Sequence, residues 1–298
     1  MQTATPGQQP LNTFDTLWII FLVVLWAGNS VIVKIAVGGI PPFYAAFFRF
    51  GAALPFIAIY ALRNNNDIRV SFRELAGIFI QSLIVVSQIF FFNYSSRYTT
   101  GGRISLFLFM YPLLVPVLGP LFIKEESFDK KKAAGMLISF TGILIALRGS
   151  FFSEDGASTL RGDIAAIISC LILAVNIVNN KRLVRTIDRW KVLFWQISFS
   201  VSFFMICGMI FESITLAAVP SESWAAVAYQ AFAVSVICFM SWQHLIAIHN
   251  SSEVTVFFFA TPLFGMLLGM IILGEPFDPY LLTAGITVGA GIYMVNRK

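Results

Sequence analysis

Charged residues are scarce in this 298-residue chain: Asp, Glu, Lys and Arg together make up 12% of it, whereas hydrophobic residues make up 58%. A soluble domain carries about 25% charged residues, so this composition excludes an ordinary globular fold in water. Long apolar runs fill most of the sequence instead. They indicate an integral membrane protein.

Cysteine and histidine are also rare. The three cysteines, Cys170, Cys207 and Cys238, all lie in apolar runs, so we interpret them as small core residues and expect no disulfide. The two histidines form no His-Glu-x-x-His pair, and the chain has no Gly-x-Ser-x-Gly turn and no Gly-rich phosphate loop. The sequence therefore argues against an enzyme and implies no metal and no other cofactor.

Carboxylates are missing from the middle of the apolar runs. All 15 Asp and Glu residues fall in predicted loops or close to the end of a run. Carboxylates inside the membrane are the groups that relay protons or neutralise cationic solutes in carriers. Their absence argues against a proton-coupled multidrug antiporter and favours an uncoupled carrier of neutral or zwitterionic solutes.

Ten apolar runs each have close to the roughly 20 residues that an α-helix needs to cross a bilayer. They are approximately residues 17–37, 42–62, 75–94, 104–123, 133–147, 162–181, 192–211, 224–245, 254–273 and 280–295. The first run is too long for the apolar core of a signal peptide, and no Lys or Arg precedes it, so we expect it to be retained. The predicted fold class is an all-α integral membrane protein with ten transmembrane helices.

The second half of the chain repeats the first. Residues 107–135 recur without a gap as residues 257–285, and the matches include Pro112 with Pro262 and Glu125 with Glu275. Ten spans divided into five and five make the second copy enter the membrane from the opposite side. We therefore predict two inverted five-helix repeats, residues 16–149 and 150–298, after a cytoplasmic tail of residues 1–15.

The basic residues favour one orientation. Of the 20 Lys and Arg residues, 14 lie in the segments after the second, fourth, sixth and tenth spans when Lys181 at the end of the sixth run is included, and four lie in the segments on the other side. This bias predicts cytoplasmic N- and C-termini in the inner (cell) membrane. The net charge of +5 thus reflects orientation. No basic stretch interleaved with aromatic residues suggests a nucleic-acid partner.

Inverted repeats favour a transporter, because each half can adopt the arrangement that the other half had and so open one central site to either side. The expected partners are a small-molecule solute and the lipid bilayer, with no obligatory protein partner. A passive channel and a non-transporting bundle are the alternatives.

Several short motifs occur together in this frame. Residues 26–30 read Trp-Ala-Gly-Asn-Ser and are followed by Lys34, residues 48–50 read Phe-Arg-Phe, and the Pro-containing fourth and ninth spans end at Glu125 and at Gly-Glu-Pro, residues 274–276. With these features the chain resembles the drug/metabolite transporter superfamily, EamA type. The resemblance implies a carrier of small metabolites, often an exporter, whose cavity is formed mainly by spans one, three, four, six, eight and nine.

Within that family the chain is most similar to the YddG-type exporters of aromatic and other amino acids. The prediction is export of aromatic and other neutral amino acids, or of similar small metabolites, by alternating access and uncoupled facilitated diffusion. A carrier of another solute class, such as a nucleobase, a sugar or an amphipathic drug, is the alternative.

Polar and aromatic residues inside spans are the candidate substrate contacts, because polar groups in hydrocarbon need a partner or a cavity. The expected contacts are Trp26, Asn29, Lys34, Gln88, Tyr111, Asn176, Trp242 and Thr261. The Lys34 ammonium either attracts a substrate carboxylate or snorkels to the headgroups. Gln88 either lines a cavity or makes interhelical hydrogen bonds. Asn176 repeats Asn29 in the second half.

Five further residues are expected to shape or move the bundle. Pro112 and Pro262 leave carbonyls without a donor in the fourth and ninth spans, so we predict hinges or gates there. We predict a structural role for Arg49, which lies too deep in the second span to snorkel easily. Glu125 and Glu275 are predicted to cap a helix start or to bind a basic loop, with gate latching as the alternative.

Overall fold

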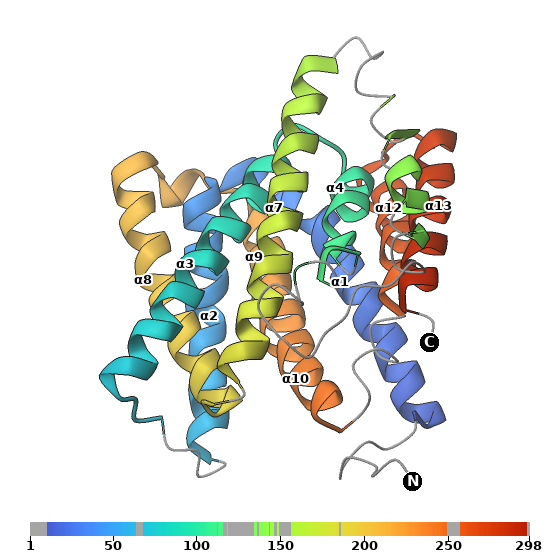
Figure 1. The fold of residues 1–298 in the computed structure, drawn as a ribbon. Helices are drawn as coiled ribbons and strands as arrows, with labels where there is room; N and C mark the ends of the chain where they lie inside the picture. The colour runs from blue at the N-terminus through green and yellow to red at the C-terminus, as the bar shows by residue number, and fades with distance from the viewer. Residues whose placement is uncertain are drawn as a thin grey trace, which may run out of the picture.

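The computed structural model of the protein describes residues 11–63, 68–111, 113–115, 118, 134–135, 137–142, 144–145, 148, 156–184, 186–248 and 257–296. These residues form a bundle of helices that contains no strand (Figure 1). The all-α class predicted from the composition is confirmed for this part of the chain.

The helices of the first half are α1 (Thr13–Gly39), α2 (Pro42–Arg63), α3 (Phe72–Ser95) and α4 (Gly101–Leu108). Those of the second half are α7 (Gly156–Leu183), α8 (Arg189–Phe211), the short η1 (Leu216–Ala218), α9 (Ser221–Tyr229), η2 (Gln230–Cys238), α10 (Phe239–Ile248), η3 (Phe257–Ala260), α12 (Thr261–Leu273) and α13 (Pro279–Asn296). Of these, η1 and η3 are 3₁₀-helices and η2 is a π-helix.

Six helical stretches are long and apolar enough to cross a membrane. They are Thr13–Gly39, Pro42–Arg63, Phe72–Ser95, Thr159–Leu183, Arg189–Phe211 and Ser221–Trp242. The expected fourth and ninth spans correspond to the shorter apolar helices Gly101–Val115 and Thr261–Leu273. The six stretches match expected spans, whereas the full number of ten stays a prediction.

Side-chain caps set where several helices begin. Asn12 Oδ1 accepts a hydrogen bond from the Asp15 N–H at the start of α1. Ser71 and Glu74 form a reciprocal capping box at the start of α3, and Asp188 Oδ1 accepts from the first amides of α8. Each cap satisfies amides that have no partner inside the helix, so the polar residues flanking the apolar runs define the helix boundaries.

Corresponding helices of the two halves run in opposite directions. In Figure 1, α1 rises from the N-terminus at the bottom, whereas α7 starts at the top and descends. Likewise α2 descends and α8 rises. The directions are those expected when the second copy of a duplicated unit enters the membrane from the other side.

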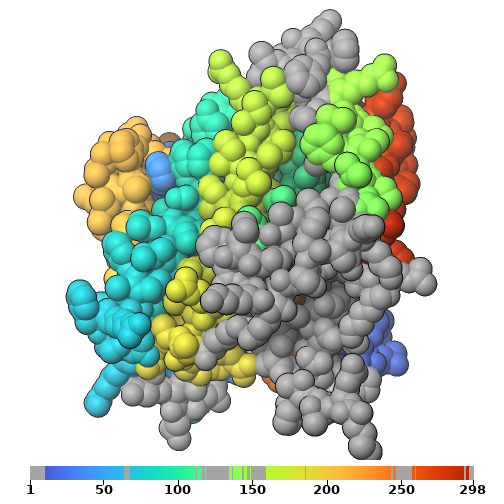
Figure 2. Space-filling view, viewed as in Figure 1, coloured from blue at the N-terminus to red at the C-terminus, as the bar shows by residue number. Residues whose placement is uncertain are grey.

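The contacts between helices also reflect the duplication. The helices α2 and α8, which are equivalent in the two halves, pack on each other, and so do α4 and α12. The contact of α3 with α7 has its equivalent in the contact of α9 and η2 with α1. Figure 2 shows α3 (teal) and α7 (yellow-green) side by side on one face of the molecule. Equivalent helices of the two halves therefore make equivalent contacts.

The outer surface of the bundle is apolar. Phe72 is 88% exposed, Phe211 72% and Ile271 69%. Exposing so many apolar side chains to water is unfavourable, whereas contact with lipid hydrocarbon is not. This surface is therefore the lipid-facing one. Functional polar groups are therefore to be sought between the helices.

Candidate functional site

A cluster of aromatic rings lies at the middle of α1. The ring centroid of Trp26 is 6.0 Å from that of Trp242 on α10 and 5.3 Å from that of Phe258 in η3. Trp242 and Phe258 are themselves 5.2 Å apart, and all three pairs meet edge to face. The structure thus brings together the two candidate tryptophans, which are 216 residues apart in the sequence.

The cluster continues to Tyr111 through Phe109. Phe109 lies 6.5 Å from Phe258 and 6.2 Å from Tyr111, measured between ring centroids. Both sides of this contact are places where a helix is irregular: α4 ends at Leu108, and η3 is a 3₁₀-turn ahead of α12. Helix breaks inside a membrane occur where backbone lines a cavity or is buried in protein, so this is where a solute site is expected. We call Trp26, Phe109, Tyr111, Trp242 and Phe258 the aromatic cluster.

Two of the polar candidates are buried without a hydrogen-bond partner. Asn29 Oδ1, one turn beyond Trp26 on α1, and Thr261 Oγ1, at the start of α12, have none. The backbone around Thr261 is held close to α4, because Ser105 Oγ donates to its carbonyl at 3.0 Å and a Cβ at Gly265 would overlap Ser105. Pro262 lies in the first turn of α12, where its missing N–H leaves no intrahelical bond unmade. Its hinge role stays a prediction.

Gln88 and Asn176 are engaged with each other's helices. Gln88 Nε2 donates to Ser169 Oγ at 2.9 Å, and Ser169 Oγ donates back to the Gln88 carbonyl. Asn176 Oδ1 accepts from Gln81 Nε2 at 2.5 Å, and Asn179 Nδ2 donates to Gln81 Oε1 at 2.6 Å. These bonds join α3 to α7, which favours the interhelical interpretation of Gln88 over a cavity-lining one.

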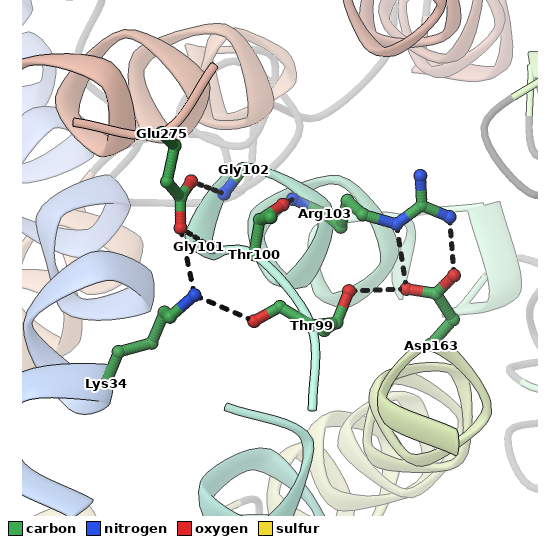
Figure 3. A network of polar contacts seen from close by, with 8 residues as sticks. All are labelled: Lys34, Thr99, Thr100, Gly101, Gly102, Arg103, Asp163 and Glu275. Atoms are coloured by element: carbon green, nitrogen blue, oxygen red, sulfur yellow. Dashed lines mark hydrogen bonds and ion pairs between the residues drawn. The ribbon is translucent and has the colours of Figure 1, made fainter. Parts of the chain in front are cut away.

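Lys34 and Glu275 form an ion pair at one end of the bundle (Figure 3). Lys34 Nζ lies 3.0 Å from Glu275 Oε1 and donates a second hydrogen bond to the Thr99 carbonyl at 3.0 Å. Glu275 also accepts from the amides of Gly101 and Gly102, at 2.8 and 3.4 Å, which are the first amides of α4. One carboxylate therefore neutralises Lys34 and caps α4, and the helix dipole favours negative charge at this position.

The position of Glu275 depends on a left-handed glycine. Gly274 ends α12 with a φ of 64°. A side chain at this φ would be strained, and glycine is not. The turn places Glu275 directly after α12, next to the start of α4.

A second ion pair lies beside the first (Figure 3). Arg103 on α4 binds Asp163 on α7 through two nitrogens, Nε at 3.0 Å from Oδ1 and Nη2 to Oδ2. Thr99 Oγ1 donates to the same Asp163 Oδ1 at 2.8 Å. Asp163 is fully buried and Arg103 is 5% exposed. We call the two pairs with Thr99 the polar latch, because they tie α1, α4, α7 and the segment after α12 together at one end.

Glu212 is a third carboxylate at the latch end, where α1 ends and α2 begins. Its two oxygens accept from the amides of Phe43 and Tyr44, the first amides of α2, at 3.0 to 3.2 Å. Loss of solvation raises the pKa of the Glu212 carboxyl above its ordinary value, although these hydrogen bonds and the charge of Arg97 act in the opposite direction.

The raised pKa predicts a pH dependence of stability. Since the folded protein binds the Glu212 proton more tightly than the unfolded chain, this group stabilises the fold below the unfolded pKa of about 4.3, and the contribution disappears as pH rises through the higher folded value. In Glu212→Gln this part of the pH dependence is lost. The thermal midpoints of the purified protein and of Glu212→Gln, measured between about pH 4 and pH 8, test this prediction. An equally steep dependence of the midpoint on pH in Glu212→Gln would contradict it.

Arg49 is buried at the contact of α2 with η2. Its Nε donates to Ser235 Oγ at 2.9 Å, its guanidinium carbon lies 4.9 Å from the ring centroid of Phe50, and the residue is 3% exposed. The structural role of Arg49 stays a prediction. Pro112 and Glu125 lie outside the described residues. Among the described residues, no group of three or more His, Cys, Asp and Glu side chains is placed to hold a metal ion.

Several residues of the two sites escape sequence reasoning. Arg103 and Asp163 lie at span ends in different halves, and no spacing relates them. Phe258 is one of 31 Phe residues.

Comparison with known sequences identifies the family of both halves. The pattern of the EamA-like transporter family matches residues 14–148 and again residues 160–297. The two matches account for nearly the whole chain and agree with the duplication seen in the sequence and in the packing.

Relatives resemble the chain over almost their full length. An uncharacterized transporter of Archaeoglobus fulgidus is 24% identical over 289 residues, which cover 97% of this chain and 99% of that protein. A protein of Salmonella typhimurium named as a probable amino-acid metabolite efflux pump is 22% identical, with 94% of each chain covered. A solved crystal structure superimposes with a TM-score of 0.67 at 19% identity and covers 95% of this chain, which shows a shared fold.

Proposed function

Because the chain belongs to the EamA-like transporter family, we propose that it is a carrier that exports neutral amino acids, aromatic ones included, or similar small metabolites by alternating access. Transport follows the solute's own gradient. The protein lies in the inner membrane with ten helices in two inverted repeats and both termini in the cytoplasm. It has no enzymatic activity. We assign it to the YddG-like type of exporters of aromatic amino acids as part of this proposal.

The aromatic cluster is the observation that carries the proposal. Its rings come from α1, α10, η3 and the end of α4, which belong to both halves of the duplication. Edge-to-face contacts are favourable between aromatic rings, so an aromatic side chain of the solute finds matching surfaces among them. The cluster also lies at the end of α4 and at the 3₁₀-turn η3, where the helices are irregular.

The polar latch supports alternating access. It closes one end of the bundle with contacts between α1, α4, α7 and the α12–α13 connection, which all have to separate before a solute can pass. The Salmonella relative, named as a probable amino-acid metabolite efflux pump, supports the solute class and the direction.

Counterflow in proteoliposomes tests the function. Vesicles are preloaded with unlabelled phenylalanine, no ion gradient is imposed, and uptake of labelled phenylalanine is followed beside a labelled nucleobase. Saturable accumulation of phenylalanine is expected. Activity that appears only with a pH or Na⁺ gradient would overturn uncoupled transport. Exchange of the nucleobase alone would overturn the proposed solute class. Uptake without saturation or counterflow would indicate a channel.

Trp26→Ala is expected to lower phenylalanine exchange roughly tenfold or more, as truncation of a central aromatic contact does. Trp18→Ala is the matched control, because Trp18 lies on the same helix but contacts Phe21, which is 45% exposed on the lipid side. The Trp18 variant should retain exchange. Equal losses in both variants, at equal amounts of folded protein, would remove the aromatic cluster from the solute path.

A further inference from the structure

Two buried atoms near the middle of the bundle have complementary chemistry and no partner. Asn29 Oδ1 on α1 is an acceptor, and Gln230 Nε2 at the start of η2 is a donor. Asn29 is 6% exposed and Gln230 is 1% exposed. A buried polar atom without a hydrogen bond has lost its water and gained nothing in return, so both atoms destabilise the present arrangement.

The repeat relates this unbonded pair to a bonded one. Asn176 repeats Asn29 in α7, and Gln81 repeats Gln230, since α3 begins at Phe72 and α9 at Ser221, 149 residues later. Between α3 and α7, Gln81 Nε2 donates to Asn176 Oδ1 at 2.5 Å. The interface of α1 with α9 and η2 is the equivalent one in the other half. The same donor and acceptor are therefore bonded in one interface and unbonded in its equivalent.

The two interfaces differ in the kind of helix that carries the glutamine. The starts of α3 and α9 are 149 residues apart, whereas the repeated stretch that follows, from Phe107 and Phe257, is 150 apart. A π-helix takes up one additional residue without breaking the helix, and Gln230 is the first residue of the π-helix η2. Gln81 lies in regular α-helix. The hydrogen bond is thus missing in the interface where the glutamine lies in a π-helix.

A ligand does not complete the unbonded pair in this arrangement. Both atoms are sealed from solvent, so no room is left beside them even for a water molecule. A partner for each atom is therefore sought within the protein, and the repeat-related bond of Gln81 with Asn176 points to the other atom of the pair.

We propose that Gln81–Asn176 and Asn29–Gln230 are alternative hydrogen bonds: the first holds the state seen here, in which the latch end is closed, and the second forms when the latch end opens. The inference rests on the alternating access proposed above and names the contacts that exchange. As α1 closes onto η2 its amide pair forms, and as α3 separates from α7 the other pair breaks.

The unequal partners of the two pairs explain which state is favoured at rest. Gln81 has a second bond from Asn179 Nδ2 at 2.6 Å, and the residue that corresponds to Asn179 on α1 is Ile32. The exchanged state therefore gains one hydrogen bond fewer, and the state with the latch closed is populated without solute.

The same substitution at the two repeat-related glutamines tests the exchange. Ser105, which is fully buried between α4 and α12 near the latch, is replaced by Cys in a background without Cys170, Cys207 and Cys238, and its reaction with a thiol reagent is timed in detergent. Gln81→Leu is expected to raise the labelling rate roughly three- to thirtyfold or more, because it removes the bond to Asn176 and the bond from Asn179, and one interhelical hydrogen bond in a membrane corresponds to that range. Gln230→Leu is expected to lower it by a similar factor.

Opposite shifts support the exchange, whereas shifts in the same direction, or no shift in either variant, would overturn it. If Gln81→Leu does not fold, Asn176→Ala removes the same bond from the α7 side and must raise the rate. The readout needs no solute, so it is independent of the counterflow assay. Unchanged labelling in a protein that still exchanges phenylalanine would reject the alternative hydrogen bonds and leave the proposed function in place.

Discussion

Arg103→Leu is expected to leave little folded protein in the membrane, and the double variant Arg103→Leu/Asp163→Leu to recover much of it. Asp163 is fully buried, and its carboxylate is held by Arg103 and Thr99. Removing the guanidinium leaves a buried charge without its counter-ion, which costs about 3–5 kcal/mol. Replacing both groups by apolar ones removes the uncompensated charge, and such swaps are often close to neutral.

Fluorescence-detected size exclusion and the thermal midpoint measure this outcome. Arg161→Leu is a suitable control, because Arg161 lies on the same end of α7 and is exposed. A double variant that is as unstable as Arg103→Leu would contradict the argument, since it would show that the pair contributes through its hydrogen bonds and packing and that the buried charge is not the cause.

Glu275→Ala is expected to open the latch end and to change transport of every solute by the same factor. Glu275 holds Lys34 and caps α4, and a hydrogen bond to a charged group contributes about 1.5–3 kcal/mol. The equilibrium between the two states should therefore shift roughly ten- to a hundredfold, since about 1.4 kcal/mol is a factor of ten. Labelling of a cysteine at Ser105 should accelerate accordingly.

Lys34→Ala distinguishes the latch from a substrate contact. If the ammonium serves Glu275 and Thr99, as its hydrogen bonds indicate, exchange of phenylalanine and of an uncharged analogue changes alike. If it binds the solute's carboxylate, as the sequence also suggested, exchange of phenylalanine falls far more. Glu275→Gln is the control, because an amide keeps an oxygen for the α4 amides and removes only the charge.

The latch and the amide pairs have different roles in the proposed cycle. The latch joins helix ends through charges, and its Arg103–Asp163 pair is buried and is therefore screened little by salt. The amide pairs are neutral and lie between helices inside the bundle. A carrier that is driven only by the solute gradient needs two conformational states of similar free energy. Exchanging one neutral hydrogen bond for another changes the free-energy difference between these states by only a small amount.

The irregular helix η2 could not be predicted from the composition. Residues 224–245 were expected to form one apolar span, and an apolar run contains no signal that separates α- from π-helix. The structure divides this stretch into α9, η2 and α10. The difference of one residue between the two repeat offsets is present in the sequence, but it acquires meaning only after the starts of α3 and α9 are known.

Sequence reasoning found the candidate residues but could not tell which of them contact one another in the aromatic cluster and which join two helices. Trp26, Tyr111 and Trp242 were singled out because aromatic or polar groups inside spans need a reason to be there, and the structure joins all three in one cluster. Gln88 and Asn176 met the same criterion and lie in an interhelical contact instead. Burial inside a span raises the cost of a polar group, but the cost is the same whether a solute or a neighbouring helix satisfies it.

The amino-acid sequence by itself determined that the protein is a helical membrane protein and that its two halves are copies, because these properties follow from composition, periodicity and repetition along the chain; the repeats and the family resemblance together predicted a transporter. Only the tertiary structure decided that Lys34 meets Glu275, that Arg103 meets Asp163 and that one of two equivalent amide pairs is unbonded. Those contacts join residues 60 to 241 positions apart. Their formation depends on how the helices pack and rotate, which no local pattern in the sequence records.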